Sequence, residues 1–267
     1  MFGVGVGVRV GGRTIVSSGG GFDPDAQAFF DRVTTAGGSL TTTEKNATNQ
    51  LVLDMKSAGI WSSMKAIYPM VGASAAACAQ NLKSSSFTGT FSSGWTFAST
   101  GVTPNGTSAY MDTNLVPTGN LAQTSQSFSV YIRDNPSSTG WDLNSEDTGA
   151  TFFSLIIAAY AGGAPFVGNN TGLTSATGIT AVGFTLNTRI INATYKIFKN
   201  NTSILTVATP TAGQTTTNFI LGARNTTSSF ANKNYAFCHI GDGLTDTQAS
   251  NFYTAVQTFQ TTLSRQV

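Results

Sequence analysis

The acidic residues that could do chemistry together lie in one short segment. Asp142, Glu146 and Asp147 fall within residues 134–149, which are rich in Gly, Ser and Asn. Closely spaced carboxylates can hydrolyse a glycosidic bond, one as nucleophile and one as proton donor. The same side chains could instead ligate calcium, which binds oxygen ligands. A solvated acidic loop is the simplest interpretation, so we expect no cofactor, with calcium kept as an alternative.

The other reactive side chains do not form a catalytic set. His239 is the only histidine, so any Ser-His or Cys-His mechanism must use it. It follows Cys238 in an expected strand, where neighbouring side chains point to opposite faces. We therefore expect a structural histidine, no enzyme activity, and two reduced, buried cysteines at Cys78 and Cys238.

A glycan-binding role rests on aromatic residues expected in loops. Trp141 stands beside Asp142 and Asn144, and Tyr160 precedes a further pair of asparagines. An exposed aromatic ring can stack on the face of a sugar, and neighbouring amides and carboxylates bind its hydroxyls. These four residues are the predicted sugar site. Trp141 is equally suited to a subunit contact, because Trp is enriched at protein interfaces.

The composition limits the possible partners. Only 10% of residues are charged and the net charge is +2, whereas about a quarter of a typical soluble domain is charged. Nucleic acid is not expected as a partner, because so small a charge makes no phosphate-binding surface. Membrane insertion is not expected either, because no segment approaches the about 20 apolar residues of a membrane span. A surface of hydroxyls and amides suits a subunit of an assembly or a protein that meets sugars.

Residues 1–21 form a separate region with a two-residue repeat. The apolar residues Phe2, Val4, Val6, Val8 and Val10 alternate with glycines at positions 3, 5 and 7. This pattern predicts a strand with one apolar and one bare face. We interpret it as an assembly arm that adds to a neighbouring subunit's sheet, with an edge strand of the chain's own sandwich as the alternative.

Residues 22–79 are predicted to be helical. Asp23 is a suitable N-cap with Pro24 at the first helical position, and apolar residues follow at helical spacing. A second helix opens with a capping box from Thr41 to Glu44. Residues 60–68 are expected to form a short turn.

Residues 80–267 are predicted to form a β-sandwich that ends in a helix. Short β-rich runs alternate with Gly, Asn, Pro and Ser clusters, which is typical of antiparallel sandwiches. The candidate strands are residues 86–90, 96–99, 109–112, 127–133, 151–159, 178–184, 190–199, 204–207, 219–223 and 236–241. A capping box from Thr245 to Gln248 then opens an amphipathic helix. We expect that helix to dock on its own domain rather than form a coiled coil.

The β-region resembles the LamG and concanavalin A-like lectin/glucanase jelly roll. The resemblance rests on NGTSAYMD (105–112), QSFSVYIR (126–133), YKIFKNN (195–201), FILGAR (219–224) and the final strand and helix up to residue 253. It implies a mainly β protein: a concanavalin A-like antiparallel β-sandwich, or jelly roll, with an N-terminal β arm, an N-terminal helical segment and a C-terminal helix. Glucanases of this fold carry a row of acids on one strand, but the only glutamates here are Glu44 and Glu146.

A wider resemblance includes the helical segment. Helices followed directly by such a jelly roll are similar to the layout of tailed-bacteriophage structural proteins. This resemblance implies a non-catalytic virion component of a tail, baseplate, fibre or head decoration, made in the host cytoplasm. Its partners would be other copies of itself, for example in a trimer, and other virion proteins. A carbohydrate-binding module for host surface glycans is the alternative, and a glycoside hydrolase is the weaker one.

Overall fold

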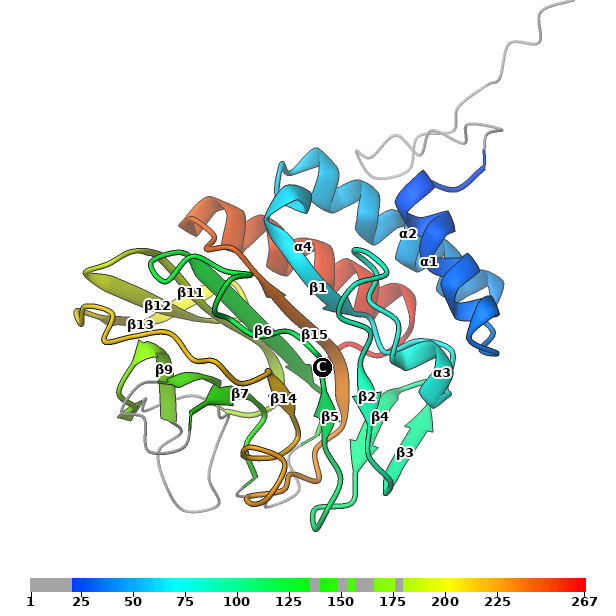
Figure 1. Ribbon diagram of the computed structural model, residues 1–267. Helices are drawn as coiled ribbons and strands as arrows, with labels where there is room; N and C mark the ends of the chain where they lie inside the picture. Colours follow the sequence, from blue (N-terminus) through cyan, green and yellow to red (C-terminus); the bar gives the residue numbers. More distant parts are fainter. Residues whose placement is uncertain (1–20, 135–139, 148–152, 157–165, 176–179) are drawn as a thin grey trace, which may run out of the picture.

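The computed structural model describes residues 21–134, 140–147, 153–156, 166–175 and 180–267. These residues build three layers, with helices above a larger β-sheet and a smaller sheet below it (Figure 1). The predicted arm, residues 1–20 of the region 1–21, lies outside the described residues.

The larger sheet is the middle layer. Its eight strands run in the order β13-β12-β11-β6-β15-β4-β3, and β1 pairs with β15 beside β4. Every described pairing between these strands is antiparallel. The strands are β1 (Met64–Tyr68), β3 (Trp95–Ala98), β4 (Gly101–Pro104), β6 (Gln126–Ile132), β11 (Gly183–Ile191), β12 (Thr194–Lys199), β13 (Thr202–Val207) and β15 (Tyr235–Gly241).

The smaller sheet lies on the side of the larger sheet away from the helices (Figure 1). Its order is β10-β9-β8-β7-β14-β5-β2. The strands are β2 (Thr90–Phe91), β5 (Met111–Asp112), β7 (Leu143–Glu146), β8 (Phe153–Ile156), β9 (Phe166–Thr171), β10 (Thr174–Ser175) and β14 (Ile220–Leu221). Met111, Leu143 and Leu221 pack between the sheets with Phe128 and Val130 of β6. Alternation along the strands therefore turns their neighbours Asp112, Asn144 and Ile220 toward the outer face.

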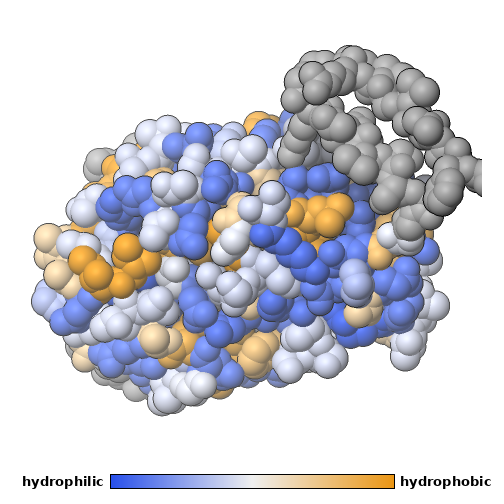
Figure 2. Space-filling view, turned by 90° about the horizontal axis from the view of Figure 1, so that it is seen from above, coloured by the Kyte–Doolittle hydropathy of each residue, from blue (hydrophilic) through white to orange (hydrophobic). Residues whose placement is uncertain are grey.

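The helices cover the opposite face of the larger sheet. They are α1 (Pro24–Thr35), α2 (Thr42–Ser57), a 3₁₀ turn at Trp61–Ser63, α3 (Ala75–Cys78) and α4 (Asp246–Thr262). A second hydrophobic cluster joins Phe29 of α1, Leu51 of α2 and Phe252 of α4 to Phe184 and Phe237 of the sheet. The outer surface of this layer is a mixture of hydrophilic and neutral side chains with small apolar patches (Figure 2). No helix in the described part of the chain has the length and apolar character needed to cross a membrane.

The sandwich and its helix caps are confirmed. Asp23 caps α1, and capping boxes open α2 at Thr41 and α4 at Thr245. Because α4 contributes Phe252 to the helix–sheet core, its predicted docking on its own domain is also confirmed. The expected turn at residues 60–68 is wrong in its second half, since β1 pairs with β15 there. Residues 22–79 thus share a sheet and a hydrophobic core with the rest of the described chain.

Candidate functional site

Three of the four predicted sugar-binding residues are buried at the start of β7. Trp141 is 5% exposed, and Asp142 and Asn144 are 0% exposed. The guanidinium of Arg224 lies 4.6 Å from the centre of the Trp141 ring, and Asn144 donates to the carbonyl oxygens of β14 and Ala223. Their predicted exposure is therefore wrong, and Asn144 lies in β7 rather than in a loop, whereas Trp141 and Asp142 do precede the strand. Tyr160 lies outside the described residues.

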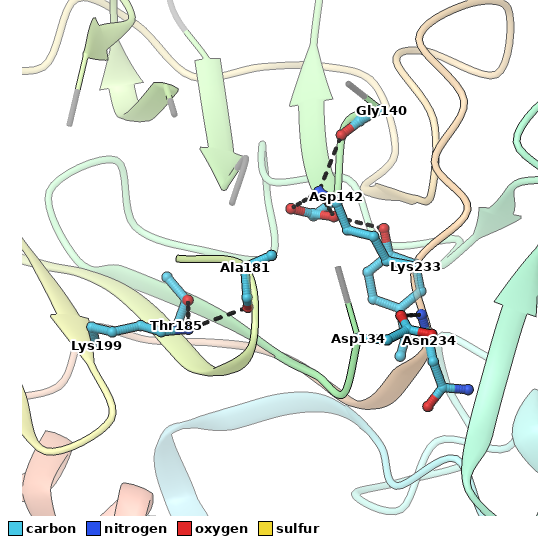
Figure 3. A network of polar contacts seen from close by, with 9 residues as sticks. Asp134, Gly140, Asp142, Ala181, Thr185, Lys199, Lys233 and Asn234 are labelled. Atoms are coloured by element: carbon cyan, nitrogen blue, oxygen red, sulfur yellow. Dashed lines mark hydrogen bonds and ion pairs between the residues drawn. The ribbon is translucent and has the colours of Figure 1, made fainter. Parts of the chain in front are cut away.

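Asp142 belongs to a buried polar network that stabilises the fold (Figure 3). Lys233 Nζ lies 2.9 and 3.0 Å from the two carboxylate oxygens, and both side chains are 0% exposed. The Tyr235 hydroxyl donates to Asp142 Oδ1 at 2.7 Å. Burial, and then the nearby Asp142 charge, raise the pKa of Tyr235. Because a buried charge costs little only when it is paired and hydrogen-bonded, these three groups depend on one another.

Each of the three predicted calcium ligands binds a different partner within the protein. Asp142 pairs with Lys233, and Glu146 forms a two-pronged ion pair with Arg224. Asp147 accepts hydrogen bonds from the backbone N–H groups of residues 216 and 217. No three His, Cys, Asp or Glu side chains gather as a metal-binding group anywhere in the described residues. The predicted calcium site is therefore not formed by these residues, because cations and N–H donors already occupy their oxygens.

His239 and the cysteines have the structural roles that were predicted. His239 is buried beside Phe252 of α4, with Ser129 Oγ 3.1 Å from Nδ1. Cys238 faces the core between the sheets, so the two side chains do point to opposite faces. Both cysteines are free and buried, and burial raises the pKa of Cys78 to about 12.

A polar groove opens on the outer face of the smaller sheet, opposite the helices. Its volume is about 510 Å³. β14 lies between β5 and β7, and its residue Ile220 is directly opposite Asp112 of β5. Glu146 is the last residue of β7. In the described part of the chain, the lining is Asp112, Val116, Glu146, Thr216, Thr217, Asn218, Ile220, Asn225 and Thr226. Three adjacent strands and the turn after β14 thus supply the groove.

Asp112 and Asn218 form one wall of the groove. Asn218 Nδ2 donates to Asp112 Oδ2 at 3.1 Å, and the backbone N–H of Asn114 donates to Oδ1 at 2.7 Å. No cationic side chain in the described residues forms an ion pair with Asp112. A half-buried carboxylate without a cation can accept hydrogen bonds from ligand hydroxyls, because each of its oxygens has more than one lone pair.

Glu146 and Asn225 are hydrogen-bonded to each other and line the groove at the end of β7. Arg224 donates to both oxygens of Glu146, at 2.7 and 2.5 Å, and Asn225 Nδ2 lies 3.3 Å from Oε2. Trp141 carries the Arg224 guanidinium on its ring face. Trp141, which was predicted to contact sugar, is therefore buried and packs against Arg224, and Arg224 in turn positions Glu146.

The turns that border the groove hold strained backbone. Asn114, Asn225 and Thr226 have φ of 57°, 46° and 66°. Positive φ is uncommon outside Gly, and for a β-branched residue such as Thr226 it is a true outlier. Such strain persists only where surrounding contacts fix it, and it is concentrated at binding sites. Here the contacts from Asp112 to Asn114 and from Glu146 to Asn225 supply the fixation.

The groove offers carboxylate, amide and hydroxyl groups above an apolar floor at Ile220. This combination of convergent polar groups and apolar contact is typical of small-molecule sites. Asp112, Asn218 and Asn225 were not predicted as site residues, because they come from three segments that only the sheet brings together. The available sequence signals were an Asp at the end of a candidate strand and Asn-Thr pairs beside β14.

No protein-family model matches the chain, and no curated protein matches its sequence. Solved structures do match its fold. Domain 4 of AbnA, a GH43 extracellular arabinanase from Geobacillus stearothermophilus in complex with arabinotriose, matches 71% of this chain and 98% of its own, with a TM-score of 0.54 and 13% identity. The chain has a lectin-like jelly-roll fold.

A second solved structure supports the same fold. A mutant of Trypanosoma rangeli sialidase displaying trans-sialidase activity matches 79% of this chain and 39% of its own, with a TM-score of 0.52 and 8% identity. Identities this low establish the jelly roll alone. Neither match bears on the predicted place in a bacteriophage particle, which stays a prediction.

Proposed function

We propose that the chain binds carbohydrate without cleaving it, through the groove between β5, β14 and β7. The observation that carries this proposal is the convergence of the Asp112 carboxylate with the amides of Asn218 and Asn225 on one open groove. A sugar presents adjacent hydroxyls that each donate and accept a hydrogen bond. A carboxylate beside an amide matches such a pair, because one accepts while the other donates.

The fold supports the same proposal. The matching arabinanase domain was solved in complex with arabinotriose, so a domain with this fold can form a complex with a neutral oligosaccharide. In this chain the Asp112 carboxylate favours neutral sugars over acidic ones, because two groups of like charge repel each other.

Cleavage is not part of the proposal. A glycosidase needs one carboxyl group that gives up a proton and a second that acts as nucleophile or base. Here Glu146 is tied to Arg224 on both oxygens, and Asp112 already accepts two N–H donors.

A panel of immobilised neutral and acidic oligosaccharides tests this function. Asp112→Asn removes one charge from the groove and should weaken binding by about tenfold or more, the equivalent of one strong hydrogen bond. Asp31→Asn on the exposed side of α1 is the matched control and should bind as the parent protein does. Failure of the parent protein to bind any sugar, or equal binding by Asp112→Asn, would refute the proposal.

A role as a virion subunit is the second candidate. Its support is the low charge of 10%, which leaves a surface of neutral groups suited to close packing, and the Gly/Val arm. A sugar-binding jelly roll on a bacteriophage particle would meet glycans on the host surface. Mass spectrometry of purified particles tests this location, and absence of the chain from them would contradict it.

A further inference from the structure

The larger sheet ends in an open edge at β13. Within the described residues, β13 pairs with β12 alone and lies at the end of the strand order. Backbone N–H and C=O groups on the outer side of such a strand are a template for another strand. The free edge is therefore the first surface to consider for a partner.

β13 lacks the features that usually protect an edge. It has six residues, Thr202–Val207, with the sequence TSILTV, and it contains no charged residue and no proline. On the opposite side of the same sheet, β3 has four residues, and the outer side of the five-residue β1 is covered by hydrogen bonds with residues 81 and 82. The edges of the smaller sheet, β2 and β10, have two residues each. Natural proteins keep edges short or charged because long neutral ones pair with other chains. Among the described edges, β13 is the one suited to accept a strand.

One face of this edge is also apolar. Ile204 and Leu205 are half-buried against a small cluster of Val167, Tyr195, Ile197 and Val207. Because β13 is the last strand, that cluster ends with apolar side chains that have water on one side. A strand with an apolar face would extend the cluster and cover them.

We propose that β13 accepts residues 2–10 of a second copy of this chain as an added strand. Those residues carry apolar side chains at every second position, with small glycines on three of the intervening positions. The apolar face would continue the cluster beside Leu205 and Val207. The glycine face of the added strand carries no side chains at these positions, so other backbone could pack closely against it. This inference concerns assembly and does not depend on sugar binding.

The position of α1 favours a second copy over self-pairing. Residues 1–20 lead into α1, which lies at the opposite end of the molecule from β13, with the helical layer and most of the larger sheet between them (Figure 1). The arm of a neighbouring molecule can reach β13 without crossing that layer. Exchange of identical arms is a common route to homo-oligomers.

Full-length variants test the arm and its acceptor separately. Val6→Lys places a charge on the apolar face of the arm. Thr206→Lys places the same charge on β13, and Thr96→Lys is its matched control, since both threonines are exposed on opposite edge strands of one sheet. Light scattering after size exclusion gives the mass in solution, and thermal melting shows whether each variant is folded.

We expect the parent protein and Thr96→Lys to be oligomers, and Val6→Lys and Thr206→Lys to be folded monomers of 27.7 kDa. An equimolar mixture of the two monomeric variants should form a 1:1 dimer, because one keeps a working acceptor and the other a working arm. A monomeric parent protein, an oligomeric Thr206→Lys, or a mixture that stays monomeric would each overturn the proposal.

Discussion

His239 should make the protein lose stability in mild acid. Burial lowers its pKa from 6.5 to about 3. Between pH 6.5 and about pH 3, His239 is protonated in the unfolded chain but neutral in the folded chain. The lowered pKa of this base therefore leaves stability intact above pH 6.5 and removes it progressively as the pH falls toward about 3.

The size of the effect follows from the shift. Each pH unit below the unfolded pKa costs about 1.4 kcal/mol, so stability should fall by about 2 kcal/mol between about pH 7.5 and about pH 5 from this residue alone. His239 is the only histidine, so no other histidine titrates in that range. Carboxylates begin to titrate near the lower end of it, which a matched variant must cancel.

Urea unfolding at the two pH values gives the measurement, with His239→Gln as the matched variant. Glutamine keeps a polar side chain near Ser129 but does not titrate. The parent protein should lose about 2 kcal/mol more than the variant on acidification. Equal losses in the two proteins would refute the reasoning, because His239 would then be protonated in the folded state as easily as in water.

Three further predictions concern other buried groups. Lys233→Met alone should cost about 3–5 kcal/mol of unfolding free energy, because it removes the cation that pairs with the buried Asp142 carboxylate, and adding Asp142→Asn should recover part of that loss in denaturant titrations. A thiol reagent should label Cys78 and Cys238 only after unfolding, and fast labelling of the native protein would contradict their burial. Trp141→Ala should cost about 3–5 kcal/mol through lost packing, and an unchanged melting temperature would show that the ring is not buried.

Helices and their caps could be predicted because their determinants are local. Asp23, Thr41 and Thr245 each stand directly before a run with helical spacing of apolar residues, and each caps a helix in the structure. The sandwich could be predicted as a class, since short strands separated by turn residues recur from residue 86 onward. These features depend on neighbouring residues alone.

Strands that bury polar side chains could not be predicted. The predicted break between residues 184 and 190 lies inside β11, whose Asn187, Thr188 and Arg189 are buried. Asn169 donates to Asn187, and Arg189 donates to backbone carbonyl oxygens, so the interior satisfies them. Alternation of apolar and polar residues is lost wherever hydrogen bonds replace apolar contacts inside a sheet.

Buried polar side chains in β7 also explain why the sugar site was predicted in the wrong place. The β7 residues Asn144 and Glu146 look like loop residues in the sequence, yet both are buried, and Trp141 before them is covered by Arg224. The groove itself joins residues more than a hundred positions apart, from Asp112 to Asn225. Only the pairing of β14 with β5 and β7 places them together, and that register has no local sequence signal.

The most direct test of the groove as a sugar site is an NMR titration of isotope-labelled protein with arabinotriose and other neutral oligosaccharides. The side-chain amide signals of Asn218 and Asn225 should shift as the ligand is added. Those of Asn81, which is buried and hydrogen-bonded to the backbone of β1, should not. In Asp112→Asn the signals of Asn218 and Asn225 should need about tenfold more ligand, or still more, to shift by the same amount. A ligand that binds while the signals of Asn218 and Asn225 do not move would contradict the account.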